Sequence, residues 1–201
     1  MEVSIPPKCF LLKPLIREVD ATCSLEERYP GVTQVSARLI YYPYFGFPVA
    51  IGSPRGSRPS PLSGLFCSED TGVPERISII VDLLEGQAAV TDITREQLEA
   101  FGPDPLPHLP FALTVPAREG FPPGKVLDAR ITMDDANKTA LTFLTFIATK
   151  SRRLRRCASE VTLGAPVLIL KPFWIMEIQS HPDNSKMLVD AVSGGYHPIL
   201  T

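Results

Sequence analysis

The sequence has little net charge, few cysteines and no long apolar run, and each of these shortages argues against a class of protein. Its 20 basic and 22 acidic residues leave a formal charge of −2, so no overall field attracts the chain to nucleic acid or to an anionic membrane. The four cysteines are far apart and lack the CxxC spacing of zinc ribbons and redox motifs. We therefore expect free thiols and no metal.

Membrane and secretion signals are also missing. The longest apolar run compatible with a helix, near residues 139–149, is about half of the length that a bilayer requires. Residues 1–20 interrupt their apolar side chains with proline and lysine, unlike a signal peptide. The sequence thus predicts a cytoplasmic chain without a membrane span.

Familiar catalytic motifs do not occur either. HExxH and GxSxG are absent, and residues 120–126 are one residue short of a phosphate loop and lack its Ser or Thr. His108, His181 and His197 each adjoin a proline in an expected loop, which favours surface histidines over ligands or bases. We expect no enzyme, no catalytic residue, no cofactor and no metal site.

Proline, in contrast, is abundant. The 21 prolines are about twice the usual share of ~5%, and many of them fall in two stretches, residues 52–75 and 102–124. Neither stretch has helical or strand periodicity. We expect the first to be a long loop insertion and the second to be a linker.

Between these stretches the pattern predicts helices and strands. Apolar residues at helical spacing predict an N-terminal helix, with a capping box at Ser24 and Glu27 that could restart it. Its predicted apolar face is Leu12, Ile16, Val19 and Cys23. Period-two alternation from Val35 predicts a strand, and the β-rich run 77–81 predicts a second strand.

Two further helices are predicted after these strands. A capped pattern predicts a short helix over 94–101, and a longer helix is expected from Thr132 with acidic residues first and arginines last. The apolar face of the longer helix is predicted to be Ala136, Ala140, Phe143, Leu144 and Ile147. The arginine cluster over 152–156 is interpreted as the solvated end of this helix, so nucleic acid is not favoured as a partner.

One pattern occurs twice. LIYYPYF at 39–45 precedes IVDLLEG at 80–86, and LILKPFW at 168–174 precedes LVDAVSG at 188–194. Each copy is an apolar strand, a proline, two aromatic residues, a return strand and Val-Asp-x-x-x-Gly. Pro43 and Pro172 cannot donate a ladder hydrogen bond, so we expect an edge strand or a bulge at each. We also expect Asp82 and Asp190 to cap backbone N–H groups of a turn in which Gly86 and Gly194 take a positive φ.

The second copy, PFWIMEI followed by MLVDAVSGG, resembles the PepSY family, and the first copy resembles it over about 24–89. The resemblance implies small helix-plus-hairpin modules without catalytic residues, of a kind proposed to inhibit or regulate peptidases. Together with the repeat, it predicts an α+β protein of two PepSY-like or cystatin-like halves, each a helix with an antiparallel hairpin. The predicted halves are 1–101, carrying the insertion 52–75, and 125–201, joined by the linker 102–124.

The predicted function is therefore non-catalytic binding or regulation of a protein or peptide partner, such as a peptidase. A small-molecule or peptide carrier with an apolar groove between the halves remains an alternative, as does an enzyme whose site the sequence does not show. The sequence leaves the oligomeric state open. The candidate binding residues are aromatic: Tyr42, Tyr44, Phe45, Phe66, Phe173 and Trp174. Trp174 is also expected to pack in the core of the second half, whose helix presents Phe143, Leu144 and Ile147.

Overall fold

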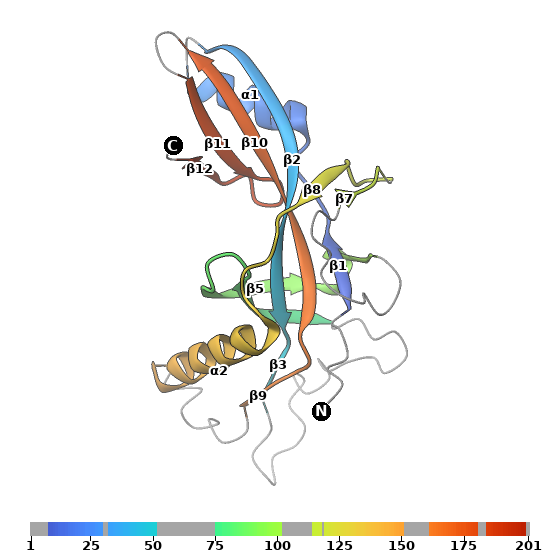
Figure 1. Ribbon diagram of the computed structural model, residues 1–201, viewed down its shortest axis with the longest axis vertical. Coiled ribbons are helices and arrows are strands. Elements are labelled where there is room, and N and C mark those ends of the chain that lie inside the picture. The colour runs from blue at the N-terminus through green and yellow to red at the C-terminus, as the bar shows by residue number, and fades with distance from the viewer. Residues whose placement is uncertain are drawn as a thin grey trace. The chain divides into compact units, whose positions relative to one another are not determined.

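The structure, a computed structural model, describes residues 8–29, 32–51, 75–101, 114–117, 119–150, 161–180 and 184–199 (Figure 1). Residues 52–74 of the predicted insertion, with Phe66, lie outside these ranges. His108, His181 and the arginine cluster 152–156 lie outside them too.

Most of the regular structure in the described ranges is strand. Two α-helices are present, α1 (Glu18–Arg28) and α2 (Met133–Lys150), with one 3-10 turn, η1 (Arg95–Gln97). The strands are β1 (Cys9–Leu12), β2 (Val32–Phe47), β3 (Val49–Ile51), β4 (Arg76–Asp82), β5 (Ala88–Thr94), β6 (Leu98–Ala100), β7 (Thr114–Val115), β8 (Gly124–Val126), β9 (Val161–Leu163), β10 (Val167–Ser180), β11 (Asn184–Asp190) and β12 (Tyr196–Ile199). Within the described ranges, neither helix combines the length and the apolar character needed to cross a bilayer.

The expected fold of two separate helix-plus-hairpin halves is wrong. One mixed ten-stranded sheet has the central order β12-β11-β10-β2-β4-β5, and β1, β6, β7 and β8 extend it; β3 pairs with β9 apart from it. The two copies of the repeat thus contribute to one sheet. Periodicity indicates where a strand lies but not which strand it pairs with, so the sequence could not exclude this arrangement.

The chain forms two compact units, and each takes segments from both ends of the sequence. Unit 1 is Met1–Phe10, Tyr44–His108 and Ala129–Ile169; unit 2 is Leu11–Pro43, Leu109–Asp128 and Leu170–Thr201. Because β2 and β10 are long, each strand belongs to both units.

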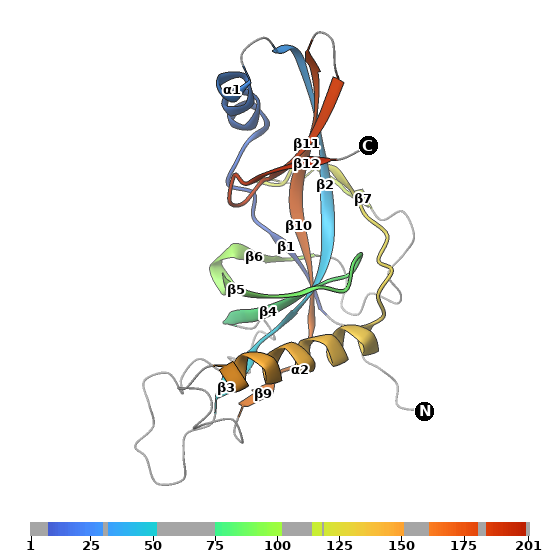
Figure 2. The ribbon, with the colours of Figure 1, turned by 90° about the vertical axis from the view of Figure 1, so that its left-hand side faces the viewer.

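In unit 1, α2 packs against the hairpin β4–β5 (Figure 2). The helix begins after Thr132, whose hydroxyl oxygen accepts a hydrogen bond from the Asp135 N–H at 3.2 Å and donates one to the Asp135 carboxylate at 2.7 Å. Its buried residues are Ala136, Ala140, Leu144 and Ala148, four apart, so a narrow stripe of mostly small side chains faces the sheet. Phe143 and Ile147, predicted for this face, are half-buried.

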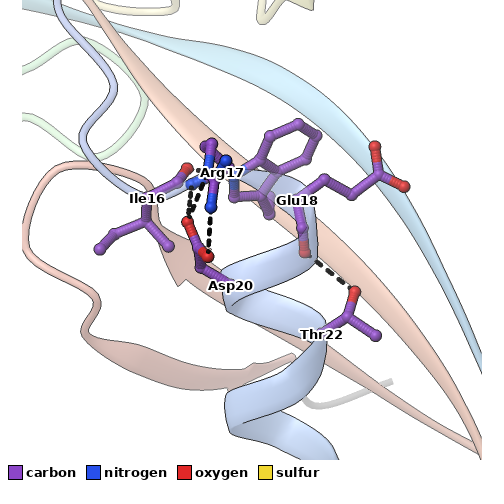
Figure 3. Close-up of polar contacts among 6 residues, drawn as sticks. Ile16, Arg17, Glu18, Asp20 and Thr22 are labelled. Atoms are coloured by element: carbon purple, nitrogen blue, oxygen red, sulfur yellow. Dashed lines mark hydrogen bonds and ion pairs between the residues drawn. The ribbon is translucent and has the colours of Figure 1, made fainter.

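In unit 2, α1 begins with a charged pair between Arg17 and Asp20 (Figure 3). The Arg17 side chain donates to both carboxylate oxygens of Asp20, at 2.9 and 3.0 Å. The helix continues through Ser24 without the predicted restart and buries Ala21 and Leu25. Val19 and Cys23 are exposed, so the predicted apolar face of this helix was wrong.

The two prolines lie inside central strands, so the edge position, one of the two alternatives expected for them, is wrong. Along β2, Ile40 and Tyr41 pair with β8, and pairing with β4 starts at Tyr44. Pro43 therefore lies between the residues of β2 that pair with β8 and those that pair with β4. Pro172 likewise directly precedes Phe173, where the pairing of β10 with β11 starts.

The two copies of the repeat have matching local geometry. Tyr44 lies opposite Asp82 in the pair β2–β4, as Phe173 lies opposite Asp190 in the pair β10–β11. In each turn, one aspartate oxygen accepts the N–H groups two and three residues later, at 2.7 and 3.2 Å for Asp82 and at 2.9 and 3.3 Å for Asp190. The side chain thus fixes the turn after each return strand.

Each of these two turns also accepts hydrogen bonds from the segment that precedes a helix. That helix belongs to the other copy of the repeat. The N–H groups of Leu15 and Ile16, before α1, donate to the Ala191 carbonyl oxygen at 2.8 Å. Two consecutive N–H groups before α2, those of residues 130 and 131, donate to the Leu83 carbonyl oxygen at 2.7 and 3.0 Å. Each unit therefore combines a hairpin from one copy with a helix from the other.

Gly194 allows a direct test of the turn. It has a φ of 75°, in the left-handed region, and a Cβ built there would meet Ile16 only at 3.8 Å. Gly194→Ala should lower the free energy of unfolding in urea by about 1–2 kcal/mol through backbone strain alone. Gly195→Ala is the matched control: its backbone lies outside that region, and its nearest contact would be ordinary. Equal effects of the two substitutions would contradict this explanation.

One further expectation from the sequence is wrong, and the described part of the expected linker contains short strands. The predicted helix over 94–101 is only the turn η1, capped by a hydrogen bond from the Thr94 N–H to Gln97 Oε1 at 2.9 Å, and β6 follows it. Residues 102–124, expected to be a linker, contain β7 and the first residue of β8, and β8 pairs in parallel with β2. The Tyr41 hydroxyl also donates to the Pro122 carbonyl oxygen at 2.8 Å.

Candidate interaction surface

Three of the aromatic residues predicted to bind a partner lie in the core. Phe45, Phe173 and Trp174 are 2%, 5% and 4% exposed. Within unit 2, the Trp174 indole N–H donates to the Ile16 carbonyl oxygen at 2.9 Å, just before α1. These rings stabilise their units in this structure.

Tyr42 and Tyr44 are half-buried. The Tyr42 ring meets the Phe173 ring edge to face, with centroids 5.8 Å apart. Recognition by these tyrosines, as by the three core residues and by Phe66, stays a prediction. The structure does not describe Phe66.

The most buried charged group in the described ranges is Asp190, at the end of β11. One of its carboxylate oxygens, Oδ2, accepts Lys171 Nζ at 2.7 Å and Ser193 Oγ at 2.6 Å. The other oxygen, Oδ1, accepts the two backbone N–H groups of the turn. Burial raises the pKa of Asp190, but the hydrogen bonds from Lys171 and Ser193 outweigh burial and leave it below 3.8.

The contacts of this cluster stabilise the turn and do not favour catalysis. The Ser193 hydroxyl donates to a carboxylate held ionised by its partners, a poor base for activating a nucleophile. Lys171 is committed to the same carboxylate. The cluster therefore explains how the turn is fixed, and it does not resemble a catalytic site.

The remaining reactive groups are dispersed. Burial raises the pKa of the Cys9 thiol to about 12, which removes its nucleophilicity near neutral pH. Cys23 and His197 are exposed in unit 2. In the part of the chain that the structure describes, no three side chains of His, Cys, Asp or Glu converge as metal ligands would.

The outer face of α2 exposes large apolar side chains. Leu141 and Phe146 are 58% and 51% exposed, unusual values for large apolar residues. Three exposed threonines accompany them: Thr142, Thr145 and Thr149. We call these five residues the α2 surface.

The polar groups of the α2 surface are largely engaged within the helix. The hydroxyls of Thr142, Thr145 and Thr149 donate to backbone carbonyl oxygens of the preceding turn, at 2.9, 2.8 and 2.8 Å. No charged residue occurs between Lys138 and Lys150 in the sequence. This long uncharged stretch is typical of a surface that another chain covers.

Charged residues mark the two ends of this helix. Asp134 and Asp135 are in the first turn, and Lys150 is in the last. The Lys150 ammonium lies 4.3 Å from the centroid of the Phe146 ring. The uncharged α2 surface therefore lies between an acidic first turn and a basic last turn of the helix.

A second, smaller pair of exposed apolar residues lies at the start of α1: Leu15 precedes the helix and Val19 is in its first turn. Leu15 and Val19 are 62% and 65% exposed, but the Arg17–Asp20 ion pair falls in the same stretch. This pair is shorter and more interrupted by charge than the α2 surface, so it is the weaker candidate.

Sequence reasoning missed the α2 surface because it assigned one apolar face to this helix. Leu141 and Phe146 do not fit that face and were not singled out. The sequence did contain a signal for a second covered face. Over 139–149 apolar residues occur all round the helix, and a helix that is apolar on every side is typically buried on every side.

Comparisons with known proteins add nothing to this assignment. No family model matches the chain, and no curated protein or solved structure matches it. The candidate surface therefore depends on the geometry of this chain.

Proposed function

We propose that the protein is a non-catalytic binding protein that acts on another protein chain through the α2 surface. The observation that supports this function is the exposure of Leu141 and Phe146 on a helix whose middle carries no charge. Surface apolar groups gathered in this way gain free energy when a partner removes them from water.

The chemistry of the other residues favours binding over catalysis. The buried carboxylate of Asp190 is saturated by its own turn and by Lys171, and the Cys9 thiol is buried and protonated. A carrier function depended on aromatic residues lining a groove, whereas Phe45, Phe173 and Trp174 are core residues. The PepSY resemblance of the repeat favours a regulatory role, with a peptidase as one class of partner.

A photo-crosslinking amino acid placed at Phe146 tests this function in the protein's native cells. Because the α2 surface would be covered by the partner, irradiation should produce a discrete adduct of higher mass, which mass spectrometry can assign. The matched control is the same probe at Val90 of β5, which is 66% exposed but lies outside the surface.

The proposed function predicts an adduct from position 146 and none of the same mass from position 90. Equal labelling at the two positions, or no protein adduct at position 146, would contradict it. Both probe variants must give the circular dichroism spectrum of the unmodified protein. This control excludes unfolding as the cause of a lost adduct.

A further inference from the structure

We infer that the partner of the α2 surface is a second copy of this chain, docked with its α2 antiparallel to the first. This inference rests on the proposed function and names the partner. A twofold interface brings the same patch of both copies together, so the patch must be complementary to itself when reversed. The charges and apolar residues of α2 meet this requirement.

The charges are complementary end to end. An antiparallel arrangement places Asp134, in the acidic first turn, beside Lys150, in the basic last turn of the other copy. Asp135 is paired with Lys138 of its own helix at 3.7 Å, so Asp134 is the acidic residue on which this contact depends. The helix dipoles then also run in opposite directions, and each end meets the opposite partial charge. A parallel arrangement would bring like charges together at both ends.

The middle of the surface is also compatible with this arrangement. Leu141 and Phe146 lie on either side of the midpoint of the uncharged stretch 139–149, so reversal of the helix brings Leu141 of one copy toward Phe146 of the other. The small threonines between them allow the two backbones to approach. Apolar area is thus buried at the centre, and the charges remain at the rim.

Other partners fit the same surface less well. A peptide or protein of one charge would be attracted at one end of α2 and repelled at the other. A membrane surface favours a helix with many basic residues on its polar face, and Lys138 and Lys150 are the only basic residues of α2. A copy of the same helix satisfies both ends at once.

Sedimentation velocity of the purified full chain tests the inference. One helix pair is a small interface, so we expect an association with a dissociation constant on the order of micromolar. The protein should sediment as a 22.1 kDa chain when dilute and at twice that mass at about 100 μM.

Phe146→Glu should weaken dimerisation more than about 30-fold, the loss expected for a central aromatic residue. Val90→Glu, at a similarly exposed apolar residue off the helix, should leave dimerisation unchanged.

A charge-exchange experiment tests the antiparallel docking. Asp134→Lys puts two basic residues at positions 134 and 150, and Lys150→Asp puts two acidic residues there, so each variant alone should dimerise at least about tenfold more weakly. Mixed one to one, the two variants carry opposite charges wherever position 134 of one copy faces position 150 of the other. They should form a heterodimer with about the affinity of the unmodified protein, and salt should weaken it.

The outcomes separate the inference from the proposed function. A monomer at every concentration, or a dimer unaffected by Phe146→Glu, overturns the second-copy assignment. A dimer that loses affinity in both variants but does not recover on mixing overturns the antiparallel docking. If the chain is monomeric while the probe at position 146 captures a different protein in cells, the inference fails and the proposed function stands.

Discussion

Replacing Trp174 by alanine is expected to lower the free energy of unfolding by about 3–5 kcal/mol, the range for truncation of a buried aromatic side chain. Trp174 is 4% exposed and pairs with Val189 of β11 in the sheet register. Its indole N–H also donates a hydrogen bond to the Ile16 carbonyl oxygen at 2.9 Å. The substitution therefore removes apolar packing and leaves a backbone acceptor without this donor.

Chemical denaturation followed by circular dichroism measures this effect, because the variant loses the only tryptophan. Trp174→Phe is the matched control: it keeps most of the apolar area but loses the N–H donor, so it should cost about 1–3 kcal/mol. A near-neutral Trp174→Ala that also loses partner binding would contradict the core assignment and restore the predicted recognition role.

The local part of the fold could be predicted from the sequence. Asp82 and Asp190 were expected to cap tight turns closed by Gly86 and Gly194, and each turn has that geometry. This prediction succeeded because the hydrogen bonds join residues two to four apart in the sequence, and the identity of the residues determines them.

The long-range part could not be predicted, because no periodicity indicates the partner of a strand or a helix. Trp174 was expected to pack against the helix that carries Phe143, Leu144 and Ile147, which is α2 of unit 1. Its indole N–H donates instead to Ile16, two residues before α1, at a separation of 158 residues. Helical spacing does not show which hairpin each helix joins.

The candidate surface was missed for a related reason. One apolar face was assigned to each helix from its spacing, so Leu141 and Phe146, which do not fit that face, were left out. Val19 and Cys23 fit the assigned face of their helix but are exposed. Helical spacing gives the relative directions of side chains. It does not show which of two apolar directions meets the sheet.

Asp190 is bound by side chains as well as by its turn, so we expect it to contribute strongly to stability. Asp82 and Asp190 make the same two turn bonds. The Oδ2 of Asp190 also accepts Ser193 Oγ and Lys171 Nζ, and its side chain is 10% exposed. In the first copy, tyrosine stands where the second has Lys171, and glutamate stands where it has Ser193.

Asp190→Ala should lower the free energy of unfolding by about 3–5 kcal/mol, because it leaves the partly buried Lys171 ammonium and two turn N–H groups without their acceptor. Lys171→Met, the matched control, should cost less than Asp190→Ala, since the carboxylate keeps Ser193 and the turn. A Lys171→Met variant as stable as the unmodified protein would show that the ion pair contributes nothing.

The pH dependence gives the same prediction a second, independent readout. The pKa of Asp190 lies below its ordinary value of 3.8 in the folded protein, because the bonds from Lys171 and Ser193 outweigh the effect of burial. A carboxyl group with a lowered folded pKa stabilises the fold fully above its unfolded pKa, and the contribution disappears as the pH falls through the folded value. The stability difference between the unmodified protein and Asp190→Asn should therefore be constant from about pH 6 to 8 and should shrink below about pH 4. A difference that grows on acidification would mean that Asp190 binds its proton more tightly in the folded state, and the ion pair with Lys171 would then not be what holds this turn.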